Sequence, residues 1–128
     1  MRDSWIKLAL LGLLGLTAWQ LAPTGVSAGN KLNNPVTLTA TSMYGSLGSA
    51  RNSANAVEHI GCSTTGGTAL CSARNAAGTT ASCSTNNAFM VQQVVGLNPM
   101  SEVYVTFSNG SCTGMNISTR SNAAVPVN

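Results

Sequence analysis

The sequence predicts a small α+β domain in which about six antiparallel strands form a sheet, one helix packs on a face of the sheet, and disulfides staple it. Two observations carry this prediction. Short stretches alternate apolar and polar residues with a period of two, and turn pairs such as Gly-Gly and Asn-Gly separate them. Four cysteines stand among Gly, Thr, Ser and Ala with no close pair, which favours disulfides over a metal site.

The amino-terminal region has the three-part layout of a secretory signal peptide. Two cations, Arg2 and Lys7, precede an uncharged apolar run from Leu8 to Trp19, and Val26-Ser27-Ala28 supplies a cleavage site. The apolar run is shorter than the roughly 20 residues that a membrane anchor needs. We therefore expect residues 1–28 to be a signal peptide, and the precursor to meet a membrane only through it.

Cleavage after Ala28 leaves one secreted domain, residues 29–128, in the medium, in the periplasm or at the cell surface. We expect its two ends, residues 29–35 and 121–128, to be flexible. Four cations against two acids leave this domain with a net charge of +2 when the histidine is neutral. The cations are scattered along the sequence, whereas a nucleic-acid-binding surface needs them clustered. The composition therefore excludes nucleic acid as the expected partner.

The four cysteines are expected to form two disulfides. An exported chain meets an oxidising environment, and an even number of cysteines fits paired thiols. The steps from Cys62 to Cys71, to Cys83 and to Cys112 are 9, 12 and 29 residues, so the chain lacks the close cysteine pair that zinc sites use. The single histidine, His59, has no second histidine to complete a metal site. We expect no metal and no cofactor.

Turn signals indicate where the disulfides lie. A Gly-Gly turn at residues 66–67 sets Cys62 opposite Cys71, at a pair whose Cα atoms approach to about 4.5 Å. A second turn at residues 75–78 sets Cys83 opposite Cys71 as well, so the turns alone leave the pairing open. We prefer the pairing in which the tighter turn sets one bridge and the other ties the meander to a distant hairpin. The preferred bridges are Cys62 with Cys71 and Cys83 with Cys112.

The remaining strands follow in chain order. Residues 35–44 alternate apolar and hydroxyl side chains and predict a first strand, and the Gly-rich and Ser-rich residues 45–56 predict a loop. The Asn-Gly pair at residues 109–110 predicts a hairpin near the end of the chain. Between them, a meander of three strands is expected over residues 57–63, 68–74 and 79–84. The predicted core face of the meander carries Ile60, Cys62, Cys71, Ala73, Ala81 and Cys83.

One helix is predicted between the meander and the last hairpin. Asn86 or Asn87 is placed to cap its start, and Gly96 and Pro99 are placed to end it. A helix of this length is marginal alone and must pack on the sheet. The apolar stripe expected to make that contact consists of Met90, Val91, Val94, Val95 and Leu97.

The chain resembles small exported bacterial proteins of unknown function. The resemblance covers about residues 44–112 and rests on the stretches GSARNSANAVEHIGC and CSARNAAG, followed by a third cysteine before a short helix. Its cysteine pattern is IGC…C-x-A-R-N-x-A-G…C. The resemblance implies a secreted bacterial domain, and it carries no known activity or site residue over to these positions.

Residues able to carry out catalysis are few, because the domain has one histidine, two glutamates and no aspartate. Glu58 and His59 are adjacent and point to opposite faces of a strand, and Glu58 with Glu102 is weak support for a glycosidase-type carboxylate pair. We expect no enzymatic activity. The weak candidates for binding are His59, Arg51 and Arg74, the two arginines because SARN occurs twice. The alternative is that each arginine braces a turn.

The export signal, the disulfides and the polar composition favour a non-enzymatic secreted or cell-envelope module, structural or binding. Its partner would be a protein or a surface that the sequence does not identify, and self-association is compatible with the composition. The alternative is a secreted effector, such as an inhibitor of an extracellular enzyme or a small toxin, in which the loop of residues 45–55 engages the target.

Overall fold

The structure is a computed structural model that describes residues 32–123; the predicted signal peptide, residues 29–31 and residues 124–128 lie outside the described part. Residues 32–123 contain seven strands and two helices, joined by turns and loops. In chain order they are β1 (Thr37–Leu38), β2 (Ser42–Ser46), α2 (Leu47–Arg51), β3 (His59–Thr65), β4 (Thr68–Arg74), β5 (Thr80–Thr85), α3 (Ala88–Val95), β6 (Ser101–Ser108) and β7 (Ser111–Thr119).

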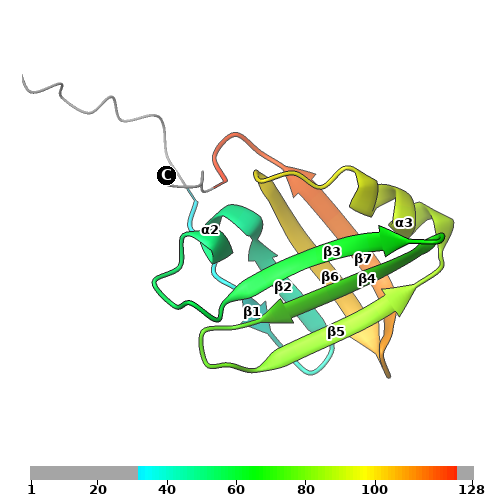
Figure 1. Ribbon diagram of the computed structural model, residues 1–128, viewed down its shortest axis with the longest axis horizontal. Coiled ribbons are helices and arrows are strands. Elements are labelled where there is room, and N and C mark those ends of the chain that lie inside the picture. The colour runs from blue at the N-terminus through cyan, green and yellow to red at the C-terminus, as the bar shows by residue number, and fades with distance from the viewer. Residues whose placement is uncertain (1–31, 124–128) are drawn as a thin grey trace, which may run out of the picture.

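The seven strands form one mixed sheet in the order β1-β2-β6-β7-β5-β4-β3. Figure 1 shows two layers: β3, β4 and β5 form a front layer, and β2, β6 and β7 cross behind it. The layers are joined where β5 runs parallel to β7, at Ser84 and Ser111. The other pairings are antiparallel. The predicted sheet is therefore confirmed, but the prediction of about six strands, all antiparallel, is corrected to seven with one parallel link.

The core fills the space between the two layers. The layers approach closely at Gly45 of β2, in the rear layer, because a Cβ built there would lie 3.5 Å from the Ile60 side chain of β3. The rear layer supplies the larger fully buried apolar side chains, which are Met43, Val103 and Val105. The front layer supplies Ala69, Cys71, Ala73 and Cys83.

The meander is built as its turns predict. The register pairs Cys62 with Cys71 and, across the next turn, Cys71 with Cys83. Gly66 and Gly67 have φ values of 57° and 81°, the left-handed conformation that a Gly-Gly hairpin turn requires. The predicted core face is confirmed for Ile60 and most of its neighbours, which are buried or half-buried.

Both preferred disulfides are confirmed. Cys62 bonds to Cys71 with a Cα–Cα distance of 4.0 Å, and Cys83 bonds to Cys112 with a Cα–Cα distance of 5.1 Å. The second bridge lies next to the single pairing of β5 with β7, so it reinforces the link between the layers. Two disulfides indicate that the protein folds in an oxidising environment.

The predicted strand over residues 35–44 is wrong, because the chain reverses within it and forms the β1–β2 hairpin. Thr39 N donates to Ser42 O at 2.9 Å, and the hydroxyls of the same two residues lie 2.7 Å apart. Thr41 N also donates to Thr39 Oγ1 at 3.3 Å. Hydroxyl side chains can bond to neighbouring backbone groups and so support a turn without Gly or Pro. The alternating pattern concealed this turn.

The predicted loop over residues 45–56 is also corrected, because it begins with helix α2. Ser46 caps this helix, its Oγ accepting a hydrogen bond from Ser49 N at 3.1 Å. Gly48, Ser49 and Ala50 are buried, and small residues of this kind let α2 pack close to β2, β3 and β6. Its five residues include one large apolar side chain, Leu47, and are too few to show helical periodicity, so the sequence pattern missed α2.

Helix α3 is confirmed, with one correction to its buried face. Asn87 is the cap, its Oδ1 accepting from Phe89 N at 3.0 Å and from Met90 N at 3.3 Å. Val94 is buried, but Val95 is 65% exposed although it was expected to face the sheet. Consecutive helical residues are about 100° apart, and the face that packs on the core is the one that carries Met90, Val91 and Val94.

The last hairpin is confirmed, with Asn109 and Gly110 at positive φ values of 48° and 77°. The two described ends of the chain also meet near this hairpin's far end. Leu32 pairs in parallel with Ala123, and Leu32 N donates to Asn122 O at 2.8 Å. A backbone hydrogen bond therefore links the two segments that were expected to be flexible, within their described residues 32–35 and 121–123.

Candidate functional site

Polar and aromatic side chains gather on the outward face of the rear layer. Strands alternate inward and outward side chains, and the register aligns the outward ones. Tyr44 lies opposite Tyr104, and Tyr104 lies opposite Asn116. Glu102 lies opposite Ser118. We name this surface the tyrosine face, and it consists of Tyr44, Glu102, Tyr104, Asn116, Ser118 and Arg120.

Glu102 is the buried centre of the tyrosine face, with 6% of its side chain exposed. Its Oε1 accepts hydrogen bonds from Asn34 Nδ2 and, at 3.4 Å, from Tyr44 OH. Its Oε2 accepts from Ser118 Oγ at 3.2 Å and lies 3.5 Å from Arg120 Nε. A buried carboxylate is tolerated when it is paired and hydrogen-bonded. Three hydrogen bonds and the ion pair with Arg120 satisfy it.

The two tyrosines form an edge-to-face pair, with ring centroids 6.4 Å apart and planes at 60°. Burial raises the pKa of Tyr44, and the nearby carboxylate of Glu102 raises it further. Tyr104 is 45% exposed, so a large part of its ring is free to contact a partner. The six side chains of the tyrosine face enclose a shallow hollow of about 140 Å³.

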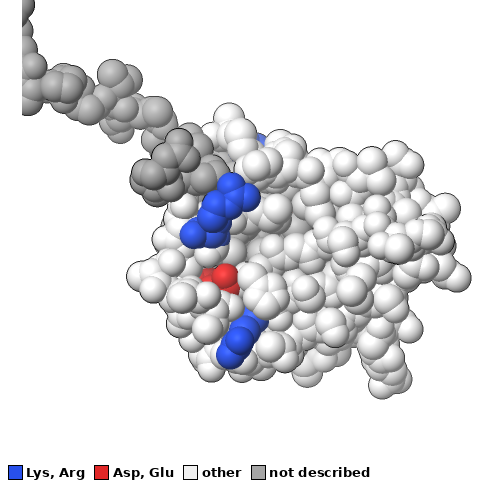
Figure 2. All heavy atoms as spheres, viewed as in Figure 1, with Lys and Arg blue, Asp and Glu red and all other residues white. Residues whose placement is uncertain are grey.

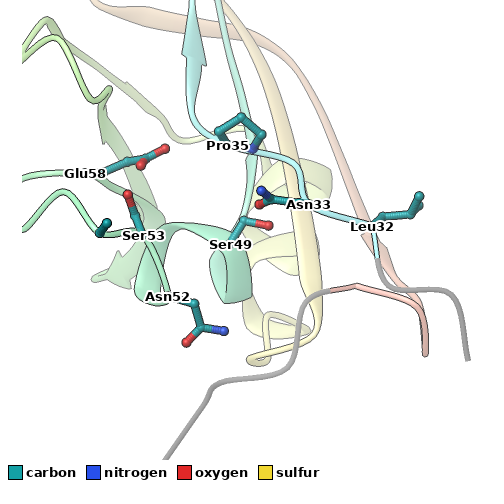
Figure 3. Close-up of a pocket in the computed structure, with 8 residues that line it drawn as sticks. Leu32, Asn33, Pro35, Ser49, Asn52, Ser53 and Glu58 are labelled. Carbon is teal, nitrogen blue, oxygen red and sulfur yellow. The ribbon is translucent and has the colours of Figure 1, made fainter. Parts of the chain in front are cut away.

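A larger pocket, of about 370 Å³, lies between the segment before β1 and the loop after α2. Figure 3 shows the side chains of Glu58, Ser53 and Asn33 around this space. Glu58 Oε1 accepts a hydrogen bond from Val36 N at 2.6 Å, which ties the carboxylate to the segment before β1. The pocket therefore offers a half-buried acid, hydroxyls and an amide to a polar ligand.

The three predicted binding residues lie outside both hollows. Arg51 is exposed at the end of α2, and His59 is exposed at the start of β3. Arg74 lies opposite His59 in the register, is half-buried, and its Nε has no hydrogen-bond partner within residues 32–123. Figure 2 shows Lys or Arg side chains on either side of a small area of Asp or Glu atoms at one end of the visible face. The rest of that face is largely uncharged.

The two SARN motifs occupy similar positions, since each ends a regular element and starts a turn. Asn52 is the carboxyl-terminal cap of α2, and its N–H donates to Gly48 O at 3.0 Å. Asn75 Oδ1 accepts from Thr79 N at 2.9 Å within the turn after β4. These positions suit the turn-bracing alternative, and a binding role for Arg51 and Arg74 stays a prediction.

The two glutamates of the described chain line different hollows, Glu58 the larger pocket and Glu102 the tyrosine face. The structure thus does not assemble the carboxylate pair that the sequence raised. Within residues 32–123 no three His, Cys, Asp or Glu side chains gather in a way that could hold a metal ion. In the same residues, no helix has the length and apolar character needed to cross a membrane.

Sequence reasoning missed the tyrosine face as a unit. The outward positions of each strand are visible in the sequence, as in Glu102 and Tyr104 or Asn116 and Ser118, because each pair is two residues apart. Nothing in the sequence indicated that β2 pairs with β6, which places Tyr44 beside Tyr104. The larger pocket was missed for the same reason, since the segment before β1 forms one of its walls.

No protein-family profile, curated protein or solved structure matches the chain, so its resemblance to small exported bacterial proteins stays a prediction.

Proposed function

We propose that the protein is a non-enzymatic secreted or cell-envelope binding module that contacts its partner through the tyrosine face. The observation that carries the proposal is the exposed Tyr104 ring beside an Arg120 side chain that is 58% exposed and held by a buried glutamate. Tyr and Arg are the residue types that contribute most to binding surfaces, and an anchored side chain loses less entropy on binding.

Export supports the same proposal. The signal peptide layout of residues 1–28 and the two disulfides both fit an oxidising compartment outside the cytoplasm. The exported protein is expected to start at Gly29, which amino-terminal sequencing tests. Recovery of Met1 on a membrane-held exported form would contradict the signal-peptide proposal.

The test of the binding function uses the oxidised exported protein as bait against culture medium and washed cell surfaces. Wild type is expected to be retained on the cell surface or extracellular matrix, and Tyr104→Ala is expected to lose most of that retention. Leu70→Ala is the matched control, because Leu70 is 53% exposed on β4, in the other layer. Equal retention of Tyr104→Ala and wild type would contradict the proposal.

The alternative function is a secreted effector that binds one soluble target, and the pocket of about 370 Å³ supports it. Ser49, Asn52 and Ser53 of the loop proposed to engage a target line this pocket, together with Glu58. A single tight heterologous partner from the medium, lost in Glu58→Gln and kept in Tyr104→Ala, would favour the effector. Gln retains the acceptor for Val36 N and removes the charge, so the variant isolates the carboxylate.

A further inference from the structure

Three side chains of the tyrosine face form a row across three neighbouring strands, and two of them, Tyr104 and Asn116, are exposed. Tyr44, Tyr104 and Asn116 are direct cross-strand partners, so two rings and an amide stand side by side over roughly 10 Å. A phenol ring offers an apolar face and a polar tip at once. Because the two rings meet edge to face, the exposed ring of Tyr104 is complementary to a partner with one apolar face and polar edges.

Hydrogen-bonding groups frame this row. Arg120 Nε lies 3.5 Å from Glu102 Oε2, and the Arg120 side chain is 58% exposed, so its guanidinium can also donate to a partner. Asn116 is exposed and its amide can both donate and accept. Glu102 is already satisfied by three hydrogen bonds and one ion pair, and it acts to orient its neighbours. The groups presented to a partner are thus donors and acceptors suited to hydroxyls.

The net charge of the tyrosine face restricts which class of partner it can bind. Glu102 and Arg120 carry opposite charges and cancel, so the face has no net charge to attract a polyphosphate or a polycation. The hollow of about 140 Å³ is also smaller than the roughly 300 to 1,000 Å³ of pockets that enclose drug-sized ligands. A neutral ring lying on the surface fits both conditions.

We infer that the tyrosine face binds a neutral sugar ring of a glycan chain, stacked on Tyr104 and hydrogen-bonded by Asn116 and Arg120. The inference rests on the proposed binding function and names its ligand class. A sugar ring has an apolar face of C–H groups and an edge of hydroxyls. The C–H face fits the Tyr104 ring, and the hydroxyls fit the polar groups of Asn116 and Arg120. A glycan chain extends beyond one ring, and the open hollow leaves room for it to continue.

The experiment measures affinity for purified neutral polysaccharides by electrophoresis through gels that contain each polysaccharide. The exported, oxidised protein is expected to be retarded by at least one of them. Tyr104→Ala and Asn116→Ala are expected to bind about tenfold more weakly or worse, whereas Tyr104→Phe keeps the ring and is expected to stay near wild type. Leu70→Ala is the surface control, and circular dichroism checks that every variant is folded.

The outcomes separate this inference from the function on which it rests. Retardation by a glycan that Tyr104→Ala leaves unchanged overturns the inference, because the sugar then binds elsewhere. Retention on cells through Tyr104 without retardation by any of the polysaccharides overturns the sugar ligand and keeps the binding module. Loss of neither retention nor retardation in Tyr104→Ala overturns both.

Discussion

The front and rear layers of the sheet differ in what sets their strand pairing, which is local turns in one and contacts between distant residues in the other. In the front layer, β3, β4 and β5 are consecutive in the chain, and short turns set their register. In the rear layer, β2 pairs with β6, so that Met43 lies opposite Val105. Local turn chemistry specifies the front layer, whereas burial of residues distant in sequence specifies the rear layer.

The two layers also differ in the side chains that they bury. The front layer buries small side chains and cysteines, and it relies on covalent bonds for part of its stability. The rear layer buries larger side chains and one charged residue, Glu102. The tyrosine face lies on the rear layer, which teaches that the candidate binding surface of this protein arises from long-range pairing.

The bridge between the layers is expected to stabilise the fold more than the bridge within the front layer. Cys83 and Cys112 are 29 residues apart, and Cys62 and Cys71 are 9 apart. The loss of unfolded-state entropy predicts that replacing both cysteines of the longer bridge by serine lowers the free energy of unfolding by about 3.6 kcal/mol, against about 2.7 kcal/mol for the shorter. Urea denaturation without reductant measures both, and a reversed order would contradict this account.

The buried acid of the rear layer is expected to matter more than the acid beside the front layer. Glu102→Ala leaves the half-buried donors of Asn34 and Ser118 without their acceptor, with an expected loss of about 2 to 3 kcal/mol. Glu58→Ala removes one bond to a half-buried carboxylate, with an expected loss of about 1 kcal/mol. Equal midpoints of the two variants in urea would show that Glu102 does not anchor the rear layer.

The hairpin turns of the two layers are expected to respond alike, because each needs a glycine at positive φ. Gly67 and Gly110 have φ values of 81° and 77°, so replacing either by alanine is expected to cost about 1 to 2 kcal/mol. Gly61→Ala is the control: its added Cβ would meet nothing within 4 Å, and its φ lies outside the left-handed region. Thermal unfolding followed by circular dichroism makes the comparison, and a loss in Gly61→Ala as large as in Gly67→Ala would refute it.

The smallest expected effect is a pH dependence that belongs to the rear layer. Burial raises the pKa of Tyr44 above its ordinary value of 10.0, so the folded protein keeps a proton that the unfolded chain has already lost. Stability contributed by this group is present below pH 10 and decreases as the pH rises through the raised pKa. Urea unfolding between about pH 8 and 11 is expected to show a shallower decline in Tyr44→Phe than in wild type. Identical slopes would remove Tyr44 as a cause.

The front layer and the last hairpin were predictable because their signals are local. Gly66-Gly67 and Asn109-Gly110 are residue pairs that adopt positive φ at low cost, and they set the strands on either side. The preferred disulfides followed from the first of these turns together with cysteine spacing. Asn87 was one of the two residues expected to cap α3, and its amide oxygen does so because it can accept from the first free N–H groups of the helix.

The missed features share a different cause. The turn between β1 and β2 uses Thr39 and Ser42, whose hydroxyls are as common in strands of this sequence as in its turns. Helix α2 buries the small residues Gly48, Ser49 and Ala50 against strands that lie elsewhere in the sequence. The parallel link at Ser84 and Ser111 joins strands separated by α3 and β6. None of these features leaves a periodic pattern within one segment.

From the sequence alone, the front layer and the last hairpin were predictable, the cap of α3 was narrowed to Asn86 or Asn87, and the two disulfides were the preferred pairing of three. This was possible because steric limits on φ and the spacing of hydrogen-bonding side chains act over a few residues. The tertiary structure alone decided that the sheet folds into two layers, that β2 lies beside β6, and that Tyr44, Tyr104 and Glu102 meet on one face. These contacts form because burying the apolar sides of distant strands together lowers the free energy, and that gain belongs to the assembled core rather than to any one segment.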